Sequence, residues 1–371
     1  YSDVNFDGMV NLYDLLLMKQ YVMGKIDSFP EAPDPPMTSE ATETSEPPQT
    51  SLEATETSEP PQTSLEATET SEPPQTSLEV TETSETPEKP VITLDDVPQD
   101  YVYALDWIWT NRIDREKSTQ RRNTVFDQIV AGNGSINYVI RWQSYKTISY
   151  EQRQKLEQIL DETINGWNDY LAGYENWPYD HIDVKITGWA VIDKSVILDP
   201  HDDEIIYDNL HEAYDSTYDT SNGYEEIPNI LPSAPDELSR FYHFSNNIGY
   251  DYPGGLDKRF DMYLWATQGF PAIGGCGGDW GQRLSDDAYL NIINSGQGIH
   301  VLQHEVGHGF GLTDFYGGEG EQDGFPPGGF PGGENSLMMA GSAAKITDFD
   351  GWMLRYMWSK IKDEDGRFNF N

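Results

Sequence analysis

Apolar and polar residues alternate along several stretches of the chain, the pattern of β-strands whose two faces differ. The clearest stretch is Ser135–Trp142, and related patterns cover His181–Val191, Ser195–Leu198 and Asp261–Ala266. The apolar face of the first stretch consists of Ile136, Tyr138, Ile140 and Trp142. These stretches predict a β-sheet. Residues 200–260, rich in Asp, Tyr, Asn and Pro, predict loops with short strands.

A spacing of three and four residues between apolar positions predicts helices among these strands. One helix follows Ser149, which forms a capping-box pattern with Gln152. Its apolar stripe consists of Leu156, Ile159, Leu160, Ile164, Trp167 and Leu171. The same spacing predicts helices at Gly298–Gly309 and at Phe349–Ile361. The packing side of the first of these two helices consists of Ile299, Leu302, Val306 and Phe310.

Residues 31–90 contain almost nothing that could form a core. The sequence TSLEATETSEPPQ recurs with a period of 13 residues from Thr50 and Thr63, and begins again with substitutions at Thr76. Low hydrophobicity, frequent proline and an excess of acids predict a disordered, self-repelling tether. This Thr/Ser/Glu/Pro-rich linker divides the chain into residues 1–30, 31–90 and a compact domain at 91–371.

Acidic residues dominate the composition, since 64 Asp and Glu stand against 23 Lys and Arg, and the net charge is -41. This charge opposes binding to nucleic acid or an anionic membrane and favours divalent metals. The single cysteine, Cys276, excludes an intrachain disulfide. The one basic cluster is interpreted as a solvated helix face, with a removable pro-segment as the alternative. It consists of Arg112, Arg115, Lys117, Arg121 and Arg122.

Residues 3–14 read DVNFDGMVNLYD, which places oxygen-bearing residues at the ligand positions of a Ca²⁺-binding loop and Gly8 at its sharp turn. Side-chain oxygens are expected from Asp3, Asn5, Asp7, Asn11 and Asp14, and a backbone carbonyl from Met9. The last loop position holds Asp where an EF-hand has Glu. The loop therefore predicts a calcium ion near the beginning of this chain.

The loop and the following LYDLLLMKQYVMG segment resemble one EF-hand-like repeat of a type I dockerin, the module that attaches bacterial enzymes to cohesins. A dockerin has two such repeats, and residues 1–30 contain one, so we call this part a partial dockerin. The resemblance implies a cohesin of a scaffoldin as partner. It also implies a secreted, extracellular, cellulosome-associated protein. The cohesin-facing positions it implies are Leu12, Tyr13, Lys19 and Gln20.

A second metal motif, HEVGHGFGLTD, runs from His304 to Asp314. On a helix, His304 and His308 stand on one face and can bind one zinc ion, while Glu305 can take a proton from metal-bound water. A positive φ at Gly311 would turn the chain back and bring Asp314 to the ion as an oxygen ligand. Three protein ligands leave a position for water, as in catalytic zinc sites.

The motif resembles the HExxHxxGxxD form of the metzincin zinc peptidases, as in snapalysin-like enzymes. Downstream, residues 336–338 are similar to the methionine turn of that family, with Met338 beneath the zinc and Met339 as the alternative by one register. The resemblance implies an α+β domain with a mixed twisted sheet, an active-site helix, a methionine turn and a C-terminal helix. Glu334 is the rival third ligand, and Ala340 replaces a tyrosine that some metzincins carry.

Two functions are compatible with these patterns. The leading one is a secreted zinc endopeptidase that hydrolyses peptide bonds through a zinc-activated water, with Glu305 as general base. The alternative is a non-catalytic carbohydrate-binding or accessory module of the cellulosome with a structural metal, suggested by the ten tryptophans. Cys276, in the sequence GGCGG, is either a thiol that caps the zinc or a small residue in a tight glycine loop.

Overall fold

The structure is a computed structural model. It describes residues 97–114, 123–212, 227–271, 274–315, 325–326, 336–339, 343–363, 366 and 368. The predicted calcium loop, the cohesin-facing positions and the linker lie outside these ranges. So do Glu334, Ala340 and the basic residues 115–122.

Among the described residues, the main sheet has the strand order β3-β2-β1-β6-β8-β7. Its strands are β1 (Ser135–Gln143), β2 (Asp183–Val191), β3 (Ile206–Tyr207), β6 (Met262–Thr267), β7 (Cys276–Gly278) and β8 (Gly281–Ser285). All neighbours pair parallel except β7 and β8, which are antiparallel. A second, two-stranded sheet pairs β4 (His211–Glu212) with β5 (Leu231–Pro232). The mixed sheet agrees with expectation. Because it is mostly parallel, the class is mixed α/β rather than the predicted α+β.

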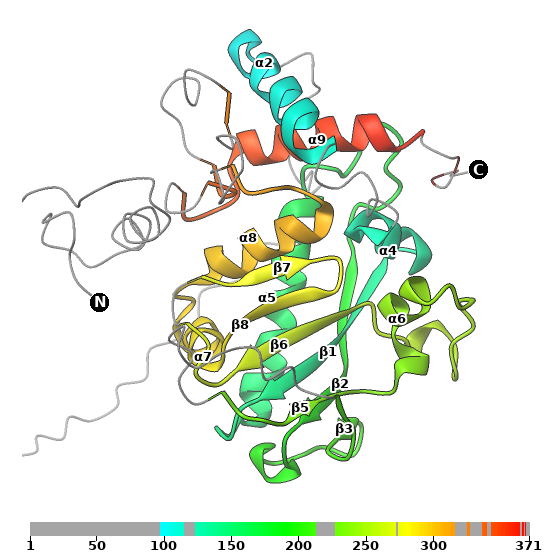
Figure 1. Cartoon of the computed structure of the whole chain (residues 1–371), viewed down its shortest axis with the longest axis vertical. Coiled ribbons are helices and arrows are strands. Elements are labelled where there is room, and N and C mark those ends of the chain that lie inside the picture. Colours follow the sequence, from blue (N-terminus) through cyan, green and yellow to red (C-terminus); the bar gives the residue numbers. More distant parts are fainter. Residues whose placement is uncertain are drawn as a thin grey trace, which may run out of the picture. The chain divides into compact units, whose positions relative to one another are not determined.

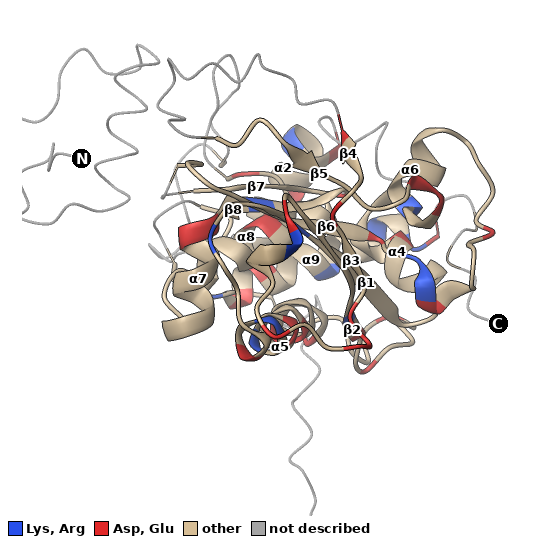
Figure 2. Ribbon diagram, turned by 90° about the horizontal axis from the view of Figure 1, so that it is seen from below, with Lys and Arg blue, Asp and Glu red and all other residues tan. Residues whose placement is uncertain are grey.

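Strand β1 is buried on both faces. Ile136, Tyr138, Ile140 and Trp142 belong to the main hydrophobic core, so the predicted apolar face is confirmed. Val139, between them, packs on the other face with Ala190, Ala234 and Phe260. Figure 2 shows why both faces are covered: helix α5 (Tyr150–Asn168) lies on one side of the sheet and β4 and β5 lie on the other.

Helix α5 begins where the capping box predicts. The backbone N–H of Gln152 donates to Ser149 Oγ at 3.3 Å, and the N–H of Ser149 donates to Gln152 Oε1 at 3.0 Å. All six residues of its predicted apolar stripe are buried. The helix connects β1 to the adjacent parallel strand β2, as a β-α-β crossover requires.

The strand predictions for residues 181–191 and 261–266 are confirmed by β2 and β6. The strand prediction at residues 195–198 is wrong, because Lys194–Val196 forms a 3₁₀ turn. The carboxylate of Asp193 accepts a hydrogen bond from the N–H of Ser195 at 2.8 Å and curls the chain there. Within residues 195–198, Ile197 makes an isolated bridge to Ile148.

Helices α8 (Ile299–Phe310) and α9 (Asp348–Ile361) lie where the apolar spacing predicts them. In Figure 1, α8 lies beside β7 and α9 crosses near α2 (Gln99–Ile108). The sequence interpretation did not identify α2, α4 (Val125–Ala131), α6 (Arg240–Ser245) or α7 (Asp286–Ser295).

Arg112 does not lie on a solvated helix face, which is the interpretation given above to the basic cluster. It lies in a π-helical turn, Trp109–Ile113, that continues α2, and it is buried together with Ile113. The π-helical turn directs both side chains into the protein, so at this position the basic residue is part of the interior.

Candidate metal centre

Helix α8 ends at Phe310, and the next residue, Gly311, adopts φ 101°. At this end of the helix, the N–H of Gly311 donates to His308 O at 2.9 Å, and the N–H of Leu312 donates to Gly307 O at 3.1 Å. A residue with a Cβ atom is strained in this left-handed conformation. The predicted positive φ is therefore confirmed, and it turns the chain so that Asp314 returns to the face of α8 that carries the histidines.

Three potential ligand atoms converge after this turn. Asp314 Oδ1 lies 3.1 Å from His304 Nε2 and 3.4 Å from His308 Nε2. The two imidazole planes stand at 87° to each other. The Oε2 atom of Glu305 is more distant, 4.0 Å from His308 Nε2. The carboxylate of Glu305 also lies close enough to the two imidazole rings to share a metal ion with them. The shorter distances favour Asp314 as ligand, and they leave Glu305 beside the ligand set.

The second nitrogen of each imidazole is engaged by the backbone. His304 Nδ1 lies 2.8 Å from Leu337 O, and His308 Nδ1 lies 2.9 Å from Leu312 O. A carbonyl oxygen can only accept, so each Nδ1 carries the proton and donates it. In the neutral rings both Nε2 lone pairs then point toward Asp314. A backbone carbonyl is one of the acceptors that commonly orient a histidine ligand.

The polar atoms between these side chains fit a metal ion. Asp314 Oδ1 is buried, and two imidazole nitrogens lie within 3.4 Å of it. Two nitrogen lone pairs and a carboxylate oxygen that face one another repel unless a proton or a metal ion lies between them. Two histidines and one carboxylate form a donor set suited to zinc, with a fourth position left open.

The pKa values reflect this concentration of charge. Burial by itself lowers the pKa of His304, but the carboxylates of Asp314 and Glu305 outweigh it and raise that pKa to about 9. Burial opposes ionisation of Asp314, yet its contacts with the two histidines hold its pKa well below the usual value. Burial raises the pKa of Glu305, and the nearby imidazoles oppose the rise. Glu305 is thus a more basic carboxylate than one on the surface.

Strand β7 passes directly over Glu305. A Cβ atom at Gly277 would lie 2.1 Å from the carbonyl oxygen of Glu305, and one at Gly275 would lie 2.8 Å from its Oε1 atom. The GGCGG sequence is therefore the start of an edge strand rather than a glycine loop, and its glycines allow the close approach. Side chains alternate along a strand, so the exposed Cys276 faces away from Glu305. Its thiol is not placed among the metal ligands.

Residues 336–339 form a turn, closed by a hydrogen bond from Met339 N–H to Ser336 O at 3.1 Å, which we call the methionine turn. Met338 is fully buried. Its sulfur lies beneath α8, since a Cβ atom at Gly307 would come within 2.6 Å of it. Gly307 stands between the two histidines, so this contact fits the role predicted for Met338, whereas Met339 is only partly buried.

Sequence reasoning missed the groups that orient the histidines. The acceptors at Leu337 and Leu312 are backbone atoms, and no residue type marks them. Trp167 was expected in the core, where it lies, but its Nε1–H also donates to Gln303 O of α8 at 3.0 Å. A tryptophan in a helical apolar stripe carries no signal for that second contact.

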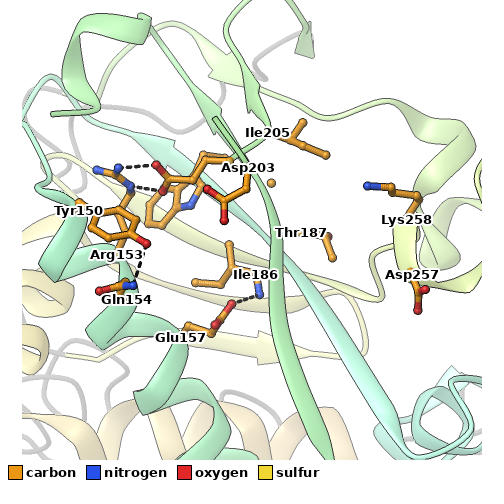
Figure 3. A pocket seen from close by; sticks show the side chains of 13 residues that line it. Tyr150, Arg153, Gln154, Glu157, Ile186, Thr187, Asp203, Ile205, Asp257 and Lys258 are labelled. Atoms are coloured by element: carbon orange, nitrogen blue, oxygen red, sulfur yellow. Dashed lines mark hydrogen bonds and ion pairs between the residues drawn. The ribbon is translucent and has the colours of Figure 1, made fainter. Parts of the chain in front are cut away.

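A cavity of about 320 Å³ lies away from the metal centre, between the beginning of α5 and strands β2 and β3. Figure 3 shows that two of its charged groups, Arg153 and Glu157, are engaged with the protein itself. Arg153 binds both carboxylate oxygens of Glu204 at 2.6 Å, and Glu157 accepts from the N–H of Ile186 at 2.7 Å. We therefore take the residues at α8, rather than this cavity, as the candidate site.

The comparisons with known proteins concern the beginning of the chain. Residues 1–44 match the family model of the type I dockerin domain, which extends beyond the boundary predicted at residue 30. No curated protein and no solved structure matches the chain. Type I dockerins bind calcium and attach to cohesins of scaffoldins, so the match implies extracellular association with a cellulosome. Within the described residues, every helix is too short or too polar to span a bilayer.

Proposed function

We propose that residues 91–371 form a zinc-dependent endopeptidase that works in a cellulosome. The observation that carries this proposal is the convergence of His304 Nε2, His308 Nε2 and Asp314 Oδ1, with the buried carboxylate of Glu305 beside them. When bound, zinc supplies an acidified water and polarises a carbonyl group. The resemblance of the motif to metzincin peptidases supports the same reaction.

Glu305 acts as general base and then as general acid. It takes a proton from the attacking water and delivers it to the leaving amine of the peptide. Its raised pKa suits both steps, because a pKa closer to the operating pH favours a group that first accepts a proton and then gives it up. Its position beneath β7 shields it from solvent, since Glu305 is 4% exposed.

The substrate is an extended peptide. Among the described residues, strand β7 is the last strand of the sheet and has a partner on one side only, β8. The backbone groups on its free side can pair with an added strand, a common mode of peptide recognition. Since β7 passes over Glu305, a peptide paired with it lies next to the base.

A cavity of about 170 Å³ accepts a side chain of this peptide. Its lining includes Leu284, Ala288 and Val301, with the amides of Asn291 and Gln297, and it contains no charged residue. Val301 lies one helical turn before Glu305. We expect an uncharged side chain next to the cleaved bond.

Metal analysis coupled to a peptide-library cleavage assay on the full chain tests this function. We expect about one zinc at this centre, cleavage that a chelator abolishes and zinc restores, and a preference for uncharged residues beside the cleaved bond. Calcium must be kept constant, so that loss of the dockerin ion is not mistaken for loss of zinc. No cleavage by the zinc-loaded protein would contradict the proposal.

The alternative is a carbohydrate-binding or accessory role with a structural metal. Trp142, Trp167 and Trp358 are fully buried and take part in the core, so they offer no surface for stacking on sugar. A cellulose pull-down, done with and without chelator, tests this alternative in parallel. Binding to cellulose together with a lack of peptide cleavage would favour it.

A further inference from the structure

The methionine turn contacts both of the segments that carry metal ligands. Leu337 O accepts the proton of His304 Nδ1 at 2.8 Å. Met338 O accepts a hydrogen bond at 2.9 Å from the N–H of Phe315, the residue after Asp314. Two successive carbonyl groups of one turn therefore set the orientation of His304 and the position of the segment that carries Asp314.

The turn is itself held by a buried carboxylate, that of Asp350, which is 0% exposed. Asp350 Oδ1 accepts from Ser336 Oγ at 2.5 Å, and Oδ2 accepts from the N–H of Leu337 at 2.8 Å. The N–H of Met338 points to the same carboxylate, 3.4 Å from Oδ1. Hydrogen bonds to an ionised acceptor are the strong ones, so this carboxylate fixes the turn firmly.

Asp350 belongs to the first turn of α9, where it also caps the helix. Its Oδ2 atom accepts from the N–H and the Oγ1–H of Thr347, at 2.8 and 2.7 Å. A local capping box needs only this contact with Thr347. The contacts of Asp350 with the methionine turn go beyond it, and they connect the beginning of α9 to the metal centre.

We propose that Asp350 is a positioning residue of the metal centre, acting through Leu337 and Met338 on His304 and Asp314. The inference rests on the proposed function, because it assumes that these residues hold a metal. Loss of the Asp350 contacts leaves the rest of the fold in place, but it loosens Leu337 O, the acceptor of His304 Nδ1. Changes to groups that orient metal ligands cost about 10–100-fold in metal affinity or activity.

Two pairs of variants separate positioning from stability. Asp350→Asn is compared with Asp348→Asn, which removes a charge from an exposed residue of the same helical turn. Ser336→Ala and Thr347→Val each remove one hydroxyl group that donates to Asp350, the first from the methionine turn and the second from the helix cap. The second pair remains informative if Asp350→Asn does not fold.

The measurements are the zinc dissociation constant, the absorption spectrum of the cobalt(II)-substituted full chain, and the melting temperature. We expect Asp350→Asn and Ser336→Ala to weaken zinc binding about 10–100-fold and to alter the cobalt spectrum. Thr347→Val should lower the melting temperature to a similar degree, but its cobalt spectrum should be the same as that of the wild type. Equal effects of Ser336→Ala and Thr347→Val on spectrum and affinity would overturn the inference, because Asp350 would then act only as a helix cap.

The wild-type protein distinguishes this inference from the proposed function. A wild type without a cobalt spectrum and without zinc binding would contradict the proposed function itself. A wild type that binds both metals, with Ser336→Ala and Asp350→Asn variants that bind them equally well, would contradict only the positioning role.

Discussion

The sulfur of Met338 lies against the backbone of Gly307, so close that a Cβ atom on Gly307 would approach it to 2.6 Å. Trp167 approaches the same point from α5, since its ring would lie 2.9 Å from that Cβ atom. The middle of the HEVGH motif is therefore a place where helix α8, the methionine turn and α5 meet. A side chain has no space there.

Gly307→Ala should destabilise the fold by about 1–3 kcal/mol, because the added methyl group overpacks a full core. Thermal unfolding of the zinc-free protein measures this. Gly249→Ala is the matched control, since a Cβ atom there meets nothing within 4 Å. If both variants melt at the wild-type temperature, the close packing of Met338 under α8 is wrong.

Zinc binding should release about one proton at pH 7.5. The pKa of His304 is raised to about 9, so the metal-free site holds a proton that zinc must displace. That proton stabilises the metal-free fold fully below the unfolded pKa of about 6.5, and its contribution is lost as the pH rises through about 9. Zinc affinity should accordingly rise with pH and level off above about 9.

Calorimetry in buffers of different ionisation enthalpy measures the proton release. Asp314→Asn removes a carboxylate that raises the pKa of His304, so the number of protons released at pH 7.5 should fall. Zinc binding without any proton release in the wild type would contradict the arrangement of His304 and Asp314.

Asp314→Asn should also weaken zinc binding by at least about 100-fold, because a direct ligand contributes more than the groups that orient it. Glu334→Gln should leave the affinity unchanged. The same titration performed on both variants decides between the two candidate ligands. The opposite result, with affinity lost only in Glu334→Gln, would show that Asp314 is not the third ligand.

Cys276→Ser should retain the zinc content and the cleavage rate of the wild type, since Cys276 is exposed on the face of β7 opposite to Glu305. Gly277→Ala is a contrasting change one residue away, and it should lower both stability and activity because its methyl group collides with the backbone of α8. A large loss of zinc in Cys276→Ser would show that the thiol is a zinc ligand.

Local patterns were sufficient to predict the elements that support the metal centre. The alternation in Ser135–Trp142 and the capping box at Ser149 predicted β1 and α5. The spacing of His304, His308 and Asp314, with a glycine to turn the chain, predicted three side chains that the structure brings together. These signals work because each depends on residues within one helix or one turn.

Contacts between distant segments could not be read in this way. Leu337 lies 33 residues after His304 and contributes a backbone oxygen. In the sequence, Asp350 resembles any acidic residue of a helix cap. Nothing there predicts that its carboxylate also binds the methionine turn. The strand predicted at 195–198 failed because the side chain of Asp193 curls the chain locally, which apolar alternation does not register. Side-chain hydrogen bonds with the backbone account for each of these cases.

The most direct test of the account compares Glu305→Ala with the wild type in zinc content and peptide cleavage, using the full chain. We expect the variant to bind the same amount of zinc, because His304, His308 and Asp314 are intact. Its cleavage rate should fall about 10²–10⁴-fold with the loss of the general base. A zinc-loaded Glu305→Ala variant that cleaves peptides at the wild-type rate would contradict it.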